Sequence, residues 1–212
     1  MKRASVVWLL AGLWLAARQA EALSFGFQDI THESATDAAI GEAQLYVDVT
    51  SVVGDPRKVQ FAFHNRGPLA SSITDGYFDD SLHALLSMDS ITGSPGVQFS
   101  RLATPQELPG GHTIGFHTTA GFSADSDPPV EPNGVNPGET LWIVYDLQTG
   151  MTLDDVTAQM LSSALRVGIH AQGFASEGSE SFVTHTPVPE PDGLALLGLS
   201  LAATAWLRRR VG

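Results

Sequence analysis

The sequence has no cysteine and few basic residues. Without cysteine, disulfide bonds, thiolate metal sites and a cysteine nucleophile are excluded. The 212 residues contain 11 Lys and Arg against 23 Asp and Glu, which gives a formal net charge of −12. A surface of this sign repels nucleic acids and anionic lipids, so we expect no nucleic-acid partner.

The first 22 residues have the pattern of a cleavable signal peptide. Two basic residues precede an uncharged, largely apolar run over 4–17, and residues 20–22 (Ala-Glu-Ala) have the small-x-small form of a signal-peptidase site. The alternatives are an N-terminal anchor and a buried helix. The run is shorter than the roughly 20 residues that span a membrane comfortably. We therefore predict a signal helix over 1–22 that is removed on export, which leaves Leu23 as the new N-terminus.

The last 25 residues, 188–212, have three parts in a fixed order. A proline-rich segment at 189–191 is followed by an uncharged, mostly apolar stretch over 193–207 and by a basic cluster at 208–210. A helix over the apolar stretch would be about 22 Å long, which is short of a hydrocarbon core of about 30 Å. Snorkelling arginines can cover part of the difference. We predict a transmembrane helix here, with its basic end in the cytoplasm.

This tail resembles the PEP-CTERM sorting signal of bacterial exported proteins. The residues that carry the resemblance are Pro189, Glu190, Pro191, Arg208, Arg209 and Arg210. The resemblance implies an exosortase as partner, an intermediate in the inner membrane, and a final location in the cell envelope or outside the cell. It also implies a link to exopolysaccharide and to the biofilm matrix. The alternative is a plain C-terminal anchor that is never processed.

Between the two ends, residues 23–187 form the predicted ectodomain, with five basic and twenty acidic residues. Short segments of alternating polarity, separated by Gly and Pro turns, predict strands. They lie at 43–50, 58–64, 72–78, 82–89, 97–102, 112–118, 140–147, 164–171 and 180–185. One helix is expected at 152–161, with Thr152 as N-cap and Asp155 three residues later. The pattern indicates a mainly β fold, an antiparallel β-sandwich of the jelly-roll kind with one short helix.

An acidic loop supplies the first candidate metal ligands. Asp125, Asp127 and Asn133 lie among prolines and glycines, and Glu131 and Glu139 are close in sequence. Ca²⁺ takes about six to eight oxygen ligands, which such a loop can offer. The EF-hand pattern fails, because the sixth and twelfth positions counted from the first aspartate lack the required glycine and glutamate. A solvated, proline-stiffened loop is the alternative, and we expect no other cofactor.

A second acidic group and four histidines complete the polar candidates. Asp75, Asp79 and Asp80 are close in sequence and are weaker candidates for a metal. His112 and His117 are five apart, so an extended strand at 112–118 would place them on opposite faces. His64 and His170 lie near predicted strand ends, where we expect hydrogen-bonded structural roles.

Three functions remain open for the ectodomain. A structural or adhesive role at the exopolysaccharide is the first hypothesis, a glycan-binding module the second, and an enzyme acting on polysaccharide the third. No nucleophile elbow or phosphate-binding glycine loop is present, so we predict no enzyme. Trp142 is expected in the core, while Tyr46 and Tyr77 are candidates for an exposed aromatic strip that would favour glycan binding. A deep cleft with two converging carboxylates would favour the enzyme.

Overall fold

The computed structural model describes residues 22–187. The predicted signal helix, apart from its last residue Ala22, the predicted transmembrane helix and the six residues of the sorting tail lie outside this range. Within it, no helix has the length and apolar character needed to cross a membrane.

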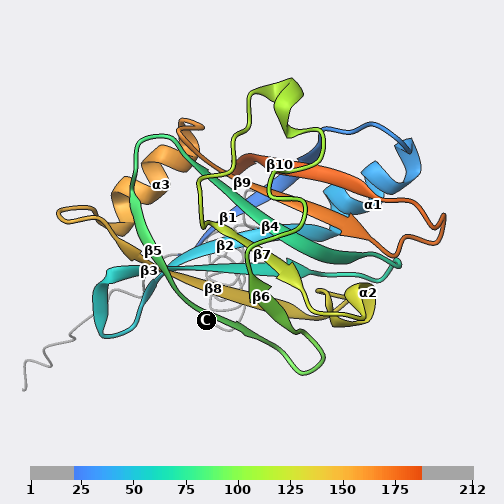
Figure 1. Ribbon diagram of the computed structural model, residues 1–212, viewed down its shortest axis with the longest axis horizontal. Helices are drawn as coiled ribbons and strands as arrows, with labels where there is room; N and C mark the ends of the chain where they lie inside the picture. Colours follow the sequence, from blue (N-terminus) through green and yellow to red (C-terminus); the bar gives the residue numbers. More distant parts are fainter. Residues whose placement is uncertain (1–21, 188–212) are drawn as a thin grey trace, which may run out of the picture.

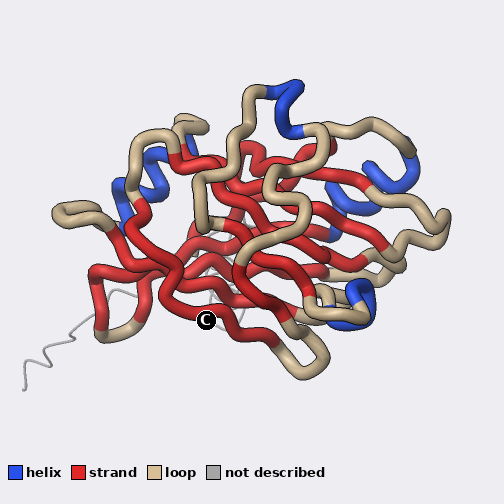
Figure 2. Tube along the Cα trace, in the orientation of Figure 1, coloured by secondary structure: helices blue, strands red, loops and turns tan. Residues whose placement is uncertain are grey.

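Ten strands form one antiparallel sheet (Figures 1 and 2). Their order across the sheet is β5-β8-β3-β2-β1-β10-β9-β4-β7-β6. The strands are β1 (Leu23–Asp29), β2 (Leu45–Val52), β3 (Asp55–Asn65), β4 (Ser72–Asp80), β5 (Leu85–Gly93), β6 (Phe99–Arg101), β7 (Ser123–Ser126), β8 (Thr140–Leu147), β9 (Leu165–Gln172) and β10 (Glu180–Pro187). The helices are α1 (Ala35–Gln44), the 3-10 helix η1 (Gly111–Ile114), α2 (Val130–Asn133) and α3 (Leu153–Leu161).

The sheet curls until its two edge strands, β5 and β6, approach each other. Arg101 on β6 donates a hydrogen bond from Nη2 to the backbone oxygen of Asp89 on β5, at 2.7 Å. The inner face holds the main core, where Phe61 of β3 and Phe78 of β4 pack edge to face with ring centroids 4.9 Å apart. Tyr145 of β8 packs against Phe78 in the same way, at 4.8 Å. Such aromatic contacts add to the stability that burial of their area gives.

The expectation of a mainly antiparallel β fold is confirmed. The expectation of two separate sheets packed as a sandwich is corrected, because the ten strands belong to one sheet. The two halves of the structure do face each other across the core, as the layers of a sandwich would. They are, however, joined into one sheet by the pairing of β1 with β10. Alternation along a strand predicts which side chains are buried, but it does not say whether two facing layers share strands.

Local sequence signals located most elements. The expected helix appears as α3, and Thr152 and Asp155 form the reciprocal hydrogen bonds of a capping box. Helix α1 was not predicted, because its sequence is weakly amphipathic. Ser34 caps the first turn of this helix, and its side chain accepts a hydrogen bond from the backbone N–H of Asp37. Gly41 of this helix lies against the ring of Phe182, where a Cβ would clash.

Two expectations about individual segments were wrong. Residues 112–118 are not a strand but η1 and the loop that follows it, with Gly110 and Gly115 on either side at φ values of 75° and 64°. Such φ values suit glycine and break an extended chain. Trp142 does not lie in the core. Strand β8 buries every second residue, and Trp142 falls on its half-buried outer face.

Candidate functional site

A long loop covers part of the outer face of the sheet. We call residues 102–122 the covering loop; it joins β6 to β7 and lies over β4 and β9 (yellow-green in Figure 1). Strand alternation sends Phe78 into the main core and turns Tyr77 outward beneath the loop. There Tyr77 forms a second, smaller core with Ala103, Leu108 and Phe116. The covering loop is therefore a packed layer with a core of its own.

Hydrogen bonds tie the covering loop to β4. Thr119 donates its backbone N–H to the oxygen of Phe78 at 2.8 Å, and its hydroxyl accepts from the N–H of Asp80 at 2.9 Å. The hydroxyl of Tyr77 donates to the backbone oxygen of Pro105 at 3.1 Å. Because these contacts lie at both ends of the loop, they fix its position over the strands.

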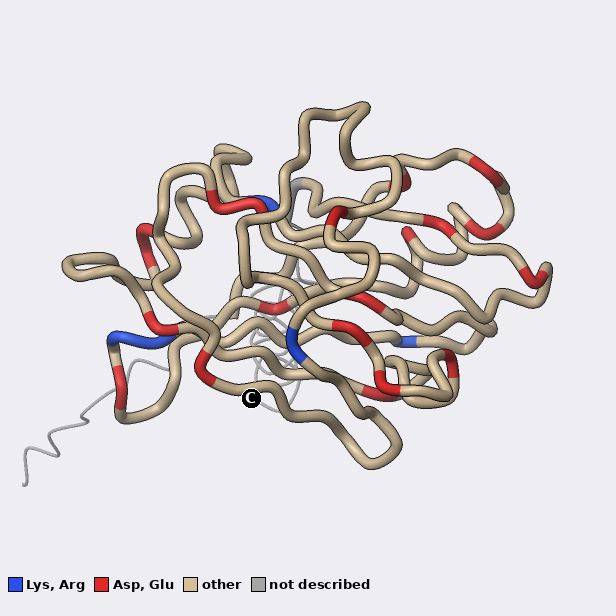
Figure 3. Tube along the Cα trace, in the orientation of Figure 1, with Lys and Arg blue, Asp and Glu red and all other residues tan. Residues whose placement is uncertain are grey.

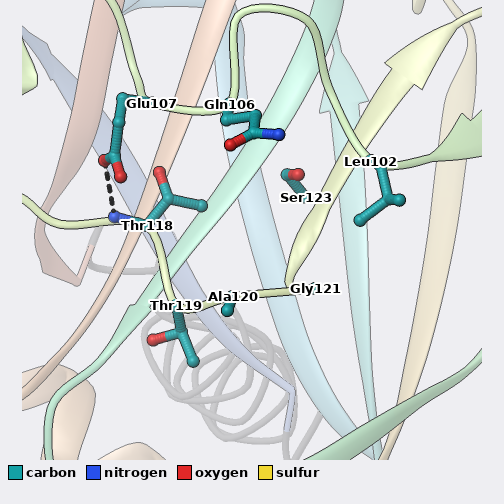
Figure 4. A pocket seen from close by; sticks show the side chains of 8 residues that line it. All are labelled: Leu102, Gln106, Glu107, Thr118, Thr119, Ala120, Gly121 and Ser123. Atoms are coloured by element: carbon teal, nitrogen blue, oxygen red, sulfur yellow. Dashed lines mark hydrogen bonds between the residues drawn. The ribbon is translucent and has the colours of Figure 1, made fainter.

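The covering loop encloses a pocket of about 240 Å³ above β7. Its lining comprises Leu102, Gln106, Glu107, Thr118, Thr119, Ala120, Gly121 and Ser123 (Figure 4). One oxygen of Glu107 accepts the backbone N–H of Thr118 at 2.9 Å, which joins the two sides of the loop. The hydroxyl oxygen of Thr118 is buried and has no hydrogen-bond partner within the described residues. The Ser123 hydroxyl accepts from the N–H of Ala103 at 3.0 Å.

Next to the covered region, five polar side chains form a row across five strands. In register from β10 to β6 they are Ser181, His170, Asp75, Asp125 and Ser100. Asp75 is buried, and desolvation together with the neighbouring Asp125 carboxylate raises the pKa of Asp75 to about 7. Two carboxylates this close cannot both ionise cheaply, so Asp75 keeps its proton up to about neutral pH.

The histidine of this row has a structural hydrogen bond, as the sequence led us to expect. His170 Nδ1 lies 3.0 Å from the hydroxyl of Ser181. Burial lowers the pKa of His170, against the opposing effect of Glu33. Asp75 instead accepts a hydrogen bond from the Thr74 hydroxyl at 2.9 Å. The row therefore contains serine, histidine and aspartate without the chain of hydrogen bonds that activates a serine nucleophile.

The three predicted calcium ligands lie near one another but have different roles. Asp125 faces Asp75, while Asp127 accepts a hydrogen bond from the Ser100 hydroxyl at 2.7 Å. Asn133 directs its amide nitrogen, not its oxygen, to the backbone oxygen of Asp127 at 2.9 Å. In residues 22–187, no group of three or more His, Asp or Glu side chains is placed to hold a metal ion. The geometry gives the calcium hypothesis no support.

The second acidic group also divides among separate partners. Asp79 pairs with Arg166, whose guanidinium also donates to the backbone oxygen of Ile114 in the covering loop at 3.1 Å. Asp80 accepts the backbone N–H groups of Ala84 and Leu85 at 2.9 and 2.8 Å, which closes the turn into β5. Two of the three aspartates therefore hold the fold together.

The opposite outer face, on β2, β3 and β8, carries a second cluster of interest. We call Tyr46, His64, Arg66 and Asp48 the aromatic ledge. The rings of Tyr46 and His64 stack with centroids 4.6 Å apart, and the Arg66 guanidinium lies 3.9 Å above the Tyr46 ring. His64 Nε2 lies 3.2 Å from Asp48, and its Nδ1 lies 3.0 Å from the Thr140 hydroxyl. His64 is thus held by two hydrogen bonds, as expected.

The expected separation of His112 and His117 was wrong. Because this segment is a 3-10 helix and a loop, the two imidazole rings lie 6.2 Å apart. Sequence reasoning also missed the pocket, since Gln106, Glu107 and Thr118 lie in segments without a motif. The one available signal was the pair of glycines around η1, which argues against a strand.

Comparison with known proteins gives one finding, and it concerns the tail. The family described as the PEP-CTERM protein-sorting motif matches residues 187–210. No curated protein and no solved structure matches the chain.

Proposed function

We propose that this chain, which carries a PEP-CTERM protein-sorting motif, is an exported surface protein with a structural or adhesive role at the exopolysaccharide. The single observation that supports it is the motif, which implies export and processing by an exosortase. The ectodomain is compatible with such a role. It is a curled sheet with two cores, and acidic residues are spread along the fold with few Lys or Arg among them (Figure 3).

The test is intact mass and cell fractionation of the native protein from hosts with and without their exosortase. We expect residues 1–22 to be absent in both strains, and residues beyond the 189–191 segment to be lost only when the exosortase is present. The matching variant replaces Arg208, Arg209 and Arg210 by glutamine in the exosortase-positive host, where processing should fail. A chain that keeps its basic end and stays in the inner membrane in both strains contradicts the proposal.

Glycan binding is the second candidate, and the pocket under the covering loop favours it. This pocket combines a carboxylate, an amide and hydroxyls with the apolar side chains of Leu102 and Ala120. Binding sites for small ligands likewise combine placed polar groups with apolar side chains. The sorted protein would then adhere through recognition of polysaccharide.

A polysaccharide-cleaving enzyme has less support. Catalytic carboxylates of glycosidases lie about 5 to 9.5 Å apart, so that a sugar and often a water fit between them. Asp75 and Asp125 instead face each other directly, as cross-strand partners on β4 and β7. Such a pair leaves no room for the bond that an enzyme would cleave, and we propose that it serves the structure.

A further inference from the structure

The polar groups of the covering-loop pocket are in part unused. The Thr118 hydroxyl is buried without a partner among residues 22–187, although buried polar groups in proteins are nearly always paired. Ser123 uses its oxygen as an acceptor for the Ala103 N–H, so its own hydrogen is free for another acceptor. Gln106 is exposed at the same opening, and its side chain points toward the pocket (Figure 4). These groups can donate to and accept from a ligand.

The size of the pocket limits that ligand to one ring. Its volume is about 240 Å³. Pockets for drug-sized ligands are larger, at about 300–1,000 Å³. The space therefore suits a single ring with several hydroxyl groups, such as the end of a chain. The exposed side chain of Leu102, at 62%, offers an apolar surface at the rim for the C–H face of that ring.

The charge around the pocket limits the ligand further. Glu107 lines it, and no Lys or Arg is among the eight lining residues. Tyr77, directly beneath the loop, has its pKa raised by burial and by the carboxylates of Asp75, Asp125 and Glu107. The nearby Arg166 is already paired with Asp79. An anionic ligand would meet uncompensated carboxylates here, whereas an uncharged ring would not.

We propose that the pocket under the covering loop binds a single neutral sugar ring at the end of a glycan chain. The proposal deepens the second candidate function and rests on it. The Thr118 and Ser123 hydroxyls and the Gln106 amide hydrogen-bond the ring hydroxyls. Leu102 packs against the sugar ring. Glu107 accepts a hydrogen bond from a further hydroxyl, and its negative charge repels the carboxylate of a uronic acid.

The test uses saturation-transfer NMR on the full chain, in a detergent whose head group carries no sugar. The probes are glucose, galactose, mannose and N-acetylglucosamine, with glucuronic acid as the anionic counterpart. We expect transfer to at least one neutral sugar and none to glucuronic acid at the same concentration. The Thr118→Val variant keeps the shape and removes the hydroxyl. It should bind at least tenfold more weakly while its melting temperature stays the same or rises.

Thr50→Val is the matched control, because Thr50 is also half-buried but lies on β2, on the other half of the sheet. It should bind the sugar as the wild type does. Absence of transfer to all four neutral sugars overturns the proposal, as does equal transfer to glucuronic acid. If sugar binding is absent while exosortase-dependent sorting is intact, the pocket proposal fails alone. Loss of both rejects the sorted-surface function as well.

Discussion

The two outer faces of the sheet each carry an aspartate, and the pKa values of these two aspartates shift in opposite directions. On the aromatic ledge, burial alone would raise the pKa of Asp48, but hydrogen bonds from His64 and Ser24 outweigh it and lower the pKa. Under the edge of the covering loop, burial raises the pKa of Asp75 and the facing Asp125 carboxylate raises it further. Burial therefore pushes both pKa values upward, and the partner across the strand decides whether that effect is reversed or reinforced.

The two faces also differ in what covers them. The covering loop buries Phe116 and Tyr77 in a second core, whereas Tyr46 and His64 of the aromatic ledge stay half-buried. A packed layer needs large apolar side chains that reach back to the sheet, and the loop supplies Leu108 and Phe116 for this purpose. The covered face therefore carries the pocket, and the uncovered face carries the stacked rings of Tyr46 and His64.

The largest difference between the faces should appear on truncating one aromatic ring from each. Phe116→Ala removes a side chain that is 1% exposed, and comparable substitutions cost about 3–5 kcal/mol. Tyr46→Ala should cost clearly less, because its ring is half-buried and its stacking contributes about 0.5–1.5 kcal/mol beyond area. Urea unfolding measures both. Equal costs would mean that the covering loop adds no core of its own.

Hydrogen exchange sharpens this comparison. With Phe116→Ala, amides of residues 102–122 should lose protection well before those of β8, because the second core no longer holds the loop. With Tyr46→Ala, the loop amides should be unchanged. A uniform loss of protection in Phe116→Ala would show that the loop and the main core unfold together.

The second prediction concerns pH and the Asp75–Asp125 pair. The folded pKa of Asp75, about 7, lies above the value of about 3.9 expected for the unfolded chain. Its contribution to stability is therefore complete below about pH 4 and is lost as the pH rises to about 7. Asp75→Asn cannot ionise, so its melting temperature should exceed that of the wild type at pH 8 by roughly 5 °C.

Thermal unfolding from pH 3 to pH 8 measures this effect. Asp125→Asn removes the facing carboxylate but leaves Asp75 buried, so it should recover only part of this gain. Both substitutions act on the same contact, so the double variant should add little to Asp75→Asn. A wild-type curve that does not fall between pH 4 and pH 7 would contradict the raised pKa of Asp75.

These two faces also show which features of the fold can be predicted from the sequence. Alternation over 43–50 and 58–64 predicts β2 and β3, and Thr152 with Asp155 predicts α3, because each signal is local. The facing of Asp75 and Asp125 depends instead on the register of β4 against β7, which brings together residues fifty apart. No local pattern encodes that register.

The covering loop was missed for a related reason. Residues 112–118 alternate as a strand would, but Gly110 and Gly115 take left-handed conformations and Phe116 turns back into the second core. The tertiary contact therefore overrides the local pattern. The pocket follows from the loop, so its residues could not be identified before the loop was placed.

The third prediction tests the hydrogen bonds that Asp48 accepts from His64 and Ser24 on the aromatic ledge. Asp48→Asn should cost about 1 kcal/mol at pH 7, because it removes the charged acceptor of His64 and Ser24 at a site that stays partly solvated. The pKa of Asp48 is lowered in the fold, so its contribution is present above about pH 4 and is lost as the pH falls. Unfolding at pH 7 and pH 3 should show a smaller cost at pH 3 than at pH 7.

The smallest expected effect belongs to Arg66, which ties the ring stack to Asp48. Its guanidinium lies above Tyr46 and helps to lower the pKa of Asp48 by charge. Arg66→Met keeps much of the apolar stem and removes the charge, so it should cost about 0.5–1 kcal/mol. A carboxyl NMR titration should show the pKa of Asp48 rising while that of Asp75 stays near 7. If both values move, the two faces are electrostatically coupled through the sheet, and the partner across the strand does not act alone.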